Sequence, residues 1–309
     1  MPATFTTSSN RPQIGGDQAR QLRSLVARRS ETRVDQPSSD RTCHTIVIAG
    51  GKGGVGRSVI ALNLAVTLAQ RGATVGLLDT CSDFGNVEFL AGLNGYWNLS
   101  HVLQGCRQVP EVIQSGPAGV RILSGGHVLT EEQPNSMSSS RSVFQQLNAF
   151  ERQLDWLIVD ASRGALSTVQ NLIEAADDLL IVTVPEPVAV AEAYATVKSF
   201  AKSRTPRLGL LVNQAESAGQ ANRILDCLQQ AAHSFLQVDL HRRGFIPRDV
   251  AVSNSVLDRI PFVLGAPESE VTFALGQLAK RWTKTRSGNE KPGFFGRLWN
   301  TCVSETPFS

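Results

Sequence analysis

The sequence lacks long apolar runs, a leader-like start and a strong charge of either sign. No run of 18 apolar residues occurs in its 309 residues, so we expect no transmembrane helix. The polar stretch 1–16 contains no apolar segment of the kind found in signal peptides. A net charge of +3 is too small to indicate nucleic-acid binding, and we expect no specific nucleic-acid partner.

The cysteines are few and scattered. The five are Cys43, Cys81, Cys106, Cys227 and Cys302. They form no C-x-x-C pair, and none has a histidine at metal-ligand spacing. We interpret them as free thiols of a protein that works in a reducing cytoplasm.

The remaining composition predicts one large domain with a tail at each end. A hydrophobic content of 41% suffices for an α/β core, which we place at residues 43–283. Residues 1–42 are polar and expected to be mostly disordered. Within them, residues 17–26 place Ala19, Leu22 and Val26 on one helical face, which predicts a short docking helix. Residues 284–309 form a linker and an amphipathic tail.

A glycine-rich stretch, Gly50–Ser58, organises the core. The apolar segment Thr45–Ala49 precedes it, and a helical pattern over 59–71 follows it. Strand, glycine-rich turn and helix form the context of a phosphate-binding loop, whose N–H groups and helix dipole attract the anion. The alternative is a glycine-rich turn without a ligand. The residues predicted to bind the nucleotide here are Gly51, Lys52, Gly53, Gly54, Val55, Gly56, Arg57 and Ser58.

The loop departs from the usual pattern G-x-x-x-x-G-K-[ST] at one position. Gly51, Gly56 and Ser58 match the pattern, but Arg57 stands where lysine is usual. Arginine keeps the positive charge on a broad planar head, so we expect phosphate binding with a poorly placed γ-phosphate. The Ser58 hydroxyl, at the start of the helix, is a candidate Mg²⁺ ligand.

The lysine inside K-G-G-V-G-x-S, Lys52, resembles the signature lysine of the MinD/ParA ATPases. This resemblance implies a P-loop NTPase fold, that is, an α/β protein with a doubly wound, mainly parallel sheet. It implies ATP and Mg²⁺ as cofactors and a homodimer that forms on ATP binding. It also implies a catalytic role for Lys52, which would reach the partner's nucleotide. The alternative is a solvated loop lysine.

Two apolar segments end in aspartates. Residues 73–79 end in Asp79 and residues 155–160 in Asp160. A carboxylate at the end of a strand beside a phosphate loop can hold Mg²⁺, directly or through water. We therefore predict a metal site of Ser58, Asp79 and Asp160. The alternative for Asp160 is a carboxylate that only caps its strand.

The segment after Asp79 is similar to the switch segment of the same family, D-x-D-x-x-x-x-N-x-x-x-x-x-G-L. Asp79, Asn86 and Gly92–Leu93 match it. Cys81 stands where the family has the aspartate that positions the attacking water, and a thiol is a weak, mostly neutral acceptor. Asp83 is the candidate catalytic substitute, although a shift of two positions is large. We expect nucleotide binding with slow or lost hydrolysis, and the sequence leaves turnover open.

Two later stretches resemble the purine site of this family. The strand-like segment Leu208–Asn213 ends in an asparagine, which in the family reads the adenine edge. Gly244–Asp249 resembles a G-x-I-P-x-D turn that places Pro247 near the purine. The resemblance therefore implies base contacts for Asn213 and Pro247. The alternative for Asn213 is an asparagine that starts a turn.

Two further strings resemble the FlhG (FleN) branch of flagellar number regulators. They are D-Q-A-x-x-L-R at Asp17–Arg23 and the stretch Thr183–Ala195, which contains P-E-P and Glu192. The resemblance implies a switch that controls flagellar number and placement and engages an FlhF-type GTPase through Asp17–Arg23. Two alternatives stay open. One is a non-hydrolysing positional scaffold of the pilus-assembly type, favoured by Arg57 and Cys81. The other is a ParA-type DNA-partition ATPase.

The end of the chain is predicted to form an amphipathic helix. Five residues of Phe294–Val303 share one side, namely Phe294, Phe295, Leu298, Trp299 and Cys302. This pattern predicts a membrane-surface helix, strengthened by avidity in a dimer. It implies a cytoplasmic protein at the inner face of the cell membrane. The alternative is a tail that packs back on the domain.

Overall fold

The structure, a computed structural model, describes residues 43–81, 86–129, 137–161, 166–201, 206–283 and 292–304. All of them belong to one compact unit, Arg41–Ser309. The predicted docking segment Asp17–Arg23 and the predicted catalytic Asp83 lie outside the described residues. No helix in the described ranges is long and apolar enough to cross a membrane.

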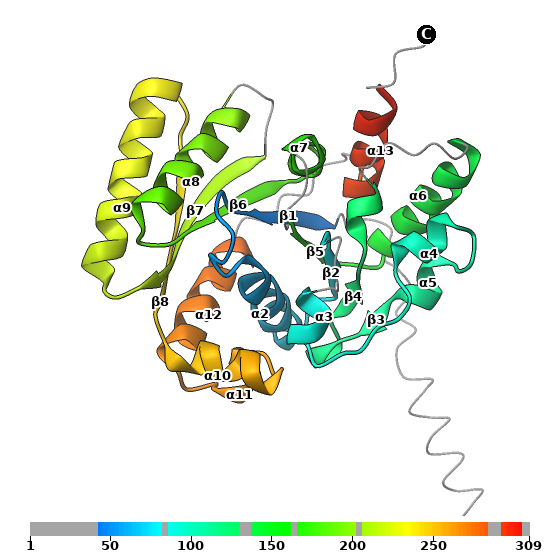
Figure 1. The fold of residues 1–309 in the computed structure, drawn as a ribbon, viewed down its shortest axis with the longest axis horizontal. Helices are drawn as coiled ribbons and strands as arrows, with labels where there is room; N and C mark the ends of the chain where they lie inside the picture. The colour runs from blue at the N-terminus through cyan, green and yellow to red at the C-terminus, as the bar shows by residue number, and fades with distance from the viewer. Residues whose placement is uncertain are drawn as a thin grey trace, which may run out of the picture. The chain divides into compact units, whose positions relative to one another are not determined.

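The centre of the unit is one sheet with the strand order β3-β4-β2-β5-β1-β6-β7-β8 (Figure 1). β1 lies inside the sheet, with β2 to β5 on one side of it and β6 to β8 on the other, so the predicted doubly wound architecture is confirmed. All pairs are parallel except β3 with β4. The strands are β1 (His44–Ala49), β2 (Val75–Asp79), β3 (Gln114–Ser115), β4 (Arg121–Leu123), β5 (Trp156–Asp160), β6 (Asp178–Thr183), β7 (Arg207–Ala215) and β8 (His241–Pro247).

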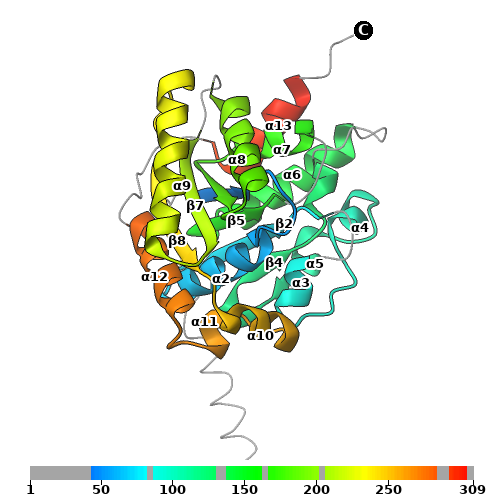
Figure 2. The same cartoon turned by 60° about the vertical axis from the view of Figure 1, so that its left-hand side comes forward.

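Helices cover both faces of the sheet (Figures 1 and 2). On one side lie α2 (Arg57–Gln70), α3 (Asn86–Leu90), α10 (Val250–Asp258), α11 (Phe262–Gly265) and α12 (Glu270–Thr283). On the other lie α4 (Leu99–Leu103), α5 (Val109–Val112), α6 (Met137–Glu151), α7 (Leu166–Glu174), α8 (Pro187–Phe200), α9 (Ala218–Ala231) and α13 (Phe294–Ser304). Three short helical turns complete the described elements, η1 (Pro117–Gly119), η2 (Gly126–Leu129) and η3 (Ala232–Leu236).

The strands are apolar because both of their faces are buried. In β1, Val47 and Ala49 face one core, while Ile46 and Ile48 face the other. Side chains alternate across a strand, so a strand covered on both sides becomes a continuous apolar run. This is why the strands ending at Ala49, Asp79 and Asp160 could be predicted. β8 was not predicted as a strand, because this edge strand has largely exposed or polar residues at its start.

The C-terminal helix packs on the domain. Its apolar residues Phe294, Phe295 and Leu298 are fully buried in the core shared with α6 and α7. The carboxylate of Glu151, at the end of α6, accepts hydrogen bonds from the N–H groups of Phe294 (2.6 Å) and Phe295 (3.1 Å). The predicted lipid contact of Phe294–Val303 is therefore wrong for this structure, since the face meant for lipid already fills a protein groove.

Candidate functional site

The loop between β1 and α2 has the geometry of an anion site. Gly56 has φ 88° and caps α2, and a Cβ atom there would lie 2.4 Å from the Asn213 Nδ2 atom. Only glycine fits such a position. The first turn of α2 contains no acidic residue, so the positive end of its dipole is not neutralised. Val55 is buried and anchors the loop in the core. A glycine-rich loop that leads into such a helix N-terminus can bind an anion through its N–H groups.

Asn213 braces this loop. Its Nδ2 group donates to the Val55 carbonyl oxygen at 2.8 Å, and the side chain is buried. The predicted purine residue Pro247 lies at the same sheet edge, because it is paired with Ala215. The Arg248 N–H also donates to the Ala215 carbonyl at 2.9 Å. The structure thus brings the two predicted base contacts to one edge and adds a bracing role for Asn213 that the sequence did not indicate.

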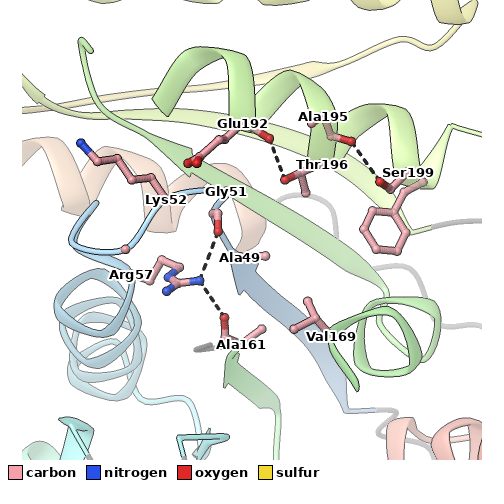
Figure 3. Close-up of a pocket in the computed structure, with 13 residues that line it drawn as sticks. Ala49, Gly51, Lys52, Arg57, Ala161, Val169, Glu192, Ala195, Thr196 and Ser199 are labelled. Carbon is pink, nitrogen blue, oxygen red and sulfur yellow. Dashed lines mark hydrogen bonds between the residues drawn. The ribbon is translucent and has the colours of Figure 1, made fainter. Parts of the chain in front are cut away.

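Arg57 ties the loop to the end of β5. Its Nη1 group donates to the carbonyl oxygens of Gly50 (3.2 Å) and Ala161 (3.1 Å), which directly follow β1 and β5 (Figure 3). A lysine at this position would have one compact ammonium group in place of a fork. The guanidinium charge consequently lies at the strand ends, close enough to Asp160 to favour the ionised form of its carboxyl group.

Asp160 is a fully buried carboxylate without a conventional partner. Neither of its oxygens accepts a normal hydrogen bond from the described residues. Burial, together with the charge of Asp79, raises its pKa from 3.8 to about 7, although the nearby Ser58 hydroxyl and Arg57 charge oppose the shift. A buried carboxylate of this kind requires a cation or a proton. The site fits Mg²⁺, which Asp160 and the Ser58 hydroxyl would hold.

Asp79 lies beside Asp160 but has a different role. Its Oδ1 accepts from the Cys81 N–H at 2.8 Å, and its Oδ2 accepts from the Val87 N–H at 3.1 Å. Burial raises the pKa of the Asp79 carboxyl, and these two hydrogen bonds partly oppose the shift. Asp79 thus anchors the start of α3, a role that sequence reasoning missed. Its part in the metal site stays a prediction.

The Cys81 region supplies a thiol beside the buried carboxylates. Cys81 is partly buried, and the Asn86 Nδ2 atom lies 3.6 Å from its Sγ. His127 was not predicted as a site residue, yet its Nδ1 lies 3.1 Å from the Cys81 carbonyl oxygen. No local signal in the sequence pointed to His127, because only the tertiary fold places η2 next to Cys81.

The loop also packs against α8. The Lys52 ammonium pairs with the carboxylate of Glu186, which precedes α8. A Cβ atom on Gly51 would lie 2.2 Å from the Cβ of Glu192, so loop and helix are in direct contact. A cavity of about 630 Å³ opens beside this contact (Figure 3). Its lining includes residues of the loop, Ala161, Val169 of α7, and Glu192, Thr196 and Ser199 of α8. Glu192 was not predicted, although it stands in the string that resembles FlhG.

Comparison with known proteins agrees with this geometry. Residues 41–283 match the family described as ParA, NUBPL iron-transfer P-loop NTPase. The antiactivator FleN of Pseudomonas aeruginosa is 30% identical over 247 residues, covering 80% of this chain and 88% of FleN. The flagellum site-determining protein YlxH of Helicobacter pylori is 28% identical over 237 residues, covering 76% of this chain and 80% of YlxH.

Among solved structures, the fold is shared with the septum site-determining protein MinD of Pyrococcus horikoshii, complexed with Mg-ADP. The TM-score is 0.62 at 20% identity, covering 79% of this chain and 97% of MinD. The glycine-rich loop between β1 and α2, the aspartates that end β2 and β5, and the family match lead to one conclusion. The chain belongs to the ParA family of P-loop NTPases.

Proposed function

We propose that the chain is an ATP-binding switch of the FleN/FlhG type that regulates flagellar number and placement. The similarity to FleN and YlxH supports the flagellar role. The nucleotide role rests on one observation above all. Asp160 is fully buried beside the phosphate loop, and neither of its oxygens has a normal hydrogen-bond partner in the described chain. A cation that binds both this carboxylate and a phosphate group would compensate the buried negative charge.

In this proposal the loop holds the phosphates through its backbone N–H groups and the start of α2. Asp160 and the Ser58 hydroxyl hold Mg²⁺, which neutralises charge on the phosphate oxygens when bound. Asn213 and Pro247 lie at the sheet edge that receives the base. The family description includes iron transfer. We do not propose this activity, because the similarity to FleN and YlxH supports the flagellar role instead.

The switch is a homodimer that forms on ATP binding in the cytoplasm. Lys52 would exchange Glu186 of its own chain for the partner's nucleotide. This exchange is feasible because the pair is exposed, with side-chain exposures of 39% and 56%. Such surface pairs contribute only about 0–1 kcal/mol. Light scattering with and without ATP tests the dimer, and a chain that stays monomeric with ATP bound contradicts it.

The partner is an FlhF-type GTPase, engaged through Asp17–Arg23. This part rests on the sequence string alone, because the segment lies outside the described residues. Deletion of residues 17–25 should abolish stimulation of such a GTPase. Stimulation that survives the deletion would exclude this segment as the docking site.

A second candidate is a non-hydrolysing positional scaffold of the MinD type. Two observations favour it. Arg57 is engaged with the Gly50 and Ala161 carbonyls, and Cys81 stands at the position of the water-positioning carboxylate. A positioned base typically contributes about 10²–10⁴-fold to a rate. Loss of that group would leave binding intact and turnover slow.

ATP binding and turnover by the wild type, Arg57→Lys, Cys81→Asp and the double variant separate these possibilities. We expect the wild type to bind ATP with very slow turnover, and the double variant to hydrolyse it faster. Wild-type turnover that no variant exceeds would favour an active ATPase and direct attention to Asp83. Failure of the wild type to bind ATP would contradict the proposed function.

A further inference from the structure

Arg259 has an unusual backbone conformation together with a side chain that donates three hydrogen bonds. It follows α10 with φ 56°, in the left-handed region that non-glycine residues rarely adopt. Its Nε donates to the Phe89 carbonyl at 3.0 Å, and its Nη2 donates to the Leu93 carbonyl at 2.8 Å and to Asn94 Oδ1 at 3.1 Å. Strained backbone persists where the surroundings over-determine it, and such positions cluster at functional sites.

The contact joins α10 to the carboxyl end of α3. The guanidinium carbon lies 4.6 Å from the centre of the Phe89 ring, while Phe89 itself is 53% exposed. The contact therefore buries little apolar surface and does not act as core packing. A cation that binds carbonyl oxygens at the end of a helix also complements the helix dipole. Its specific effect is to fix where α3 ends.

Both helices lead from this contact to the candidate nucleotide site. The buried carboxylate of Asp79, next to Asp160, accepts the N–H of Val87 in the first turn of α3 and the N–H of Cys81. Asp249 caps the N-terminus of α10, and its side chain accepts from the Ala251 N–H at 2.8 Å. Asp249 lies two residues after Pro247, at the predicted purine edge. α10 thus links the purine edge to α3, and α3 links Arg259 to Asp79 (Figures 1 and 2).

We propose that Arg259 is a positioning residue that couples occupation of the purine edge to the position of α3. A nucleotide that contacts the β8–α10 turn would hold α10 in place. Through its hydrogen bonds to the end of α3, Arg259 would then hold α3 in place against Asp79. The inference rests on the proposed nucleotide binding. A ligand that fills only the phosphate loop would not contact the β8–α10 turn, so it would not fix the position of α3 through Arg259.

The test variant is Arg259→Gly, because glycine adopts φ 56° without strain and so removes the side chain without disturbing the fold. Gln237→Gly is the matched control. Gln237 has the same φ of 56° at the end of η3, and its side chain donates to the carbonyl oxygens of His233 and Ser234 in that same turn. Arg259→Lys keeps the positive charge on one compact ammonium group in place of the planar guanidinium, and should retain part of the coupling.

Hydrogen exchange of the full chain provides the readout. The amides of Ala91, Gly92 and Leu93 bond to carbonyls of α3, including the Phe89 carbonyl that Arg259 holds. In the wild type, Mg-ADP should slow their exchange more than Mg-pyrophosphate, which has no base. In Arg259→Gly these amides should exchange about tenfold faster without ligand, and the difference between the two ligands should disappear. Gln237→Gly should behave as the wild type.

Two results would overturn the coupling alone. The first is equal slowing of α3 by both ligands in the wild type, with the phosphate loop protected. The second is an ADP-specific effect that survives Arg259→Gly. If Mg-ADP protects neither the loop nor α3 in the wild type, the proposed nucleotide binding fails as well, and the coupling fails with it.

Discussion

Asp79 and Asp160 are register partners at the ends of β2 and β5, and both carboxylates are fully buried. Asp79 accepts two backbone N–H groups, whereas Asp160 accepts no normal hydrogen bond from the described residues. Neighbouring like charges in a buried site disfavour simultaneous ionisation. The pair thus divides into a structural carboxylate that holds α3 and a second carboxylate available to a cation.

Asp160→Asn should stabilise the ligand-free protein at high pH. The pKa of Asp160 is raised from 3.8 to about 7 in the fold, so its contribution to stability is complete below pH 3.8 and lost as the pH rises to about 7. At pH 8 the free energy of unfolding of the variant should exceed that of the wild type by on the order of a few kcal/mol. Below pH 4 the two free energies should be equal. Urea unfolding at both pH values, in chelator, measures this difference.

Asp155→Asn is the control at the other end of β5. Its carboxylate accepts the Thr74 N–H at 2.9 Å, and because a hydrogen bond to an ionised acceptor is stronger than one to a neutral amide oxygen, the control should lose stability. A less stable Asp160→Asn at pH 8 would contradict the assignment of Asp160 as an unpaired carboxylate.

Asp178→Asn should destabilise the fold at neutral pH by about 3–5 kcal/mol, because it leaves the charge of Arg243 buried without its partner. Asp178 bonds to Arg243 at 2.9 Å, Arg207 at 3.0 Å and His44 at 2.6 Å. Burial alone would raise the pKa of Asp178, but the His44 hydrogen bond and the three positive or protonatable neighbours hold it below 3.8.

The resulting stability is present above pH 3.8 and lost as the pH falls through the lower pKa of the folded state. Urea unfolding at pH 7 and pH 3 should show the gap between wild type and Asp178→Asn narrowing in acid. Asp239→Asn is the matched control, since that carboxylate is 91% exposed. Equal decreases in the free energy of unfolding of the two variants would contradict the claim that burial makes the Asp178 ion pairs important for stability.

Asn213→Ala should weaken the binding of both ATP and tripolyphosphate, because the Val55 carbonyl loses its donor and the loop its brace. The loss of a buried hydrogen bond costs about 1–3 kcal/mol. The affinity for ATP should fall more than the affinity for tripolyphosphate if Asn213 also contacts the base. Calorimetric titration of both ligands measures this, and unchanged tripolyphosphate affinity would exclude the bracing role.

Leu298→Ala should destabilise the protein by about 2–5 kcal/mol, the usual range for a fully buried leucine. The exposed Asn222 on α9 provides the control, and Asn222→Ala should stay within about 0.5 kcal/mol of the wild type. Thermal unfolding of the three proteins checks both values. Equal melting temperatures for all three would show that α13 does not belong to the folded core.

The central part of the fold was predictable because its signals are local. Buried parallel strands become apolar runs, and a phosphate loop needs glycines at fixed spacing between a strand and a helix. The sequence therefore placed Gly51–Ser58, Asp79 and Asp160 at one end of neighbouring strands, and the sheet order confirms that these elements meet. Asn213 and Pro247 also reach a common edge, as the family resemblance implied.

Contacts between distant segments could not be predicted. Arg259 reaches carbonyls of residues 166 and 170 positions earlier, and Glu151 binds the start of a helix 143 residues later. Nothing in the local sequence of either residue specifies such a partner.

The C-terminal helix shows the same division most clearly. By itself the sequence determined that residues 294–303 form a helix with one apolar side, because the spacing of its large side chains has helical period. An apolar stripe gains the same free energy from lipid as from a protein groove. Only the tertiary structure decided between them, since it places α6 and α7 together and presents the Glu151 carboxylate to the helix N-terminus.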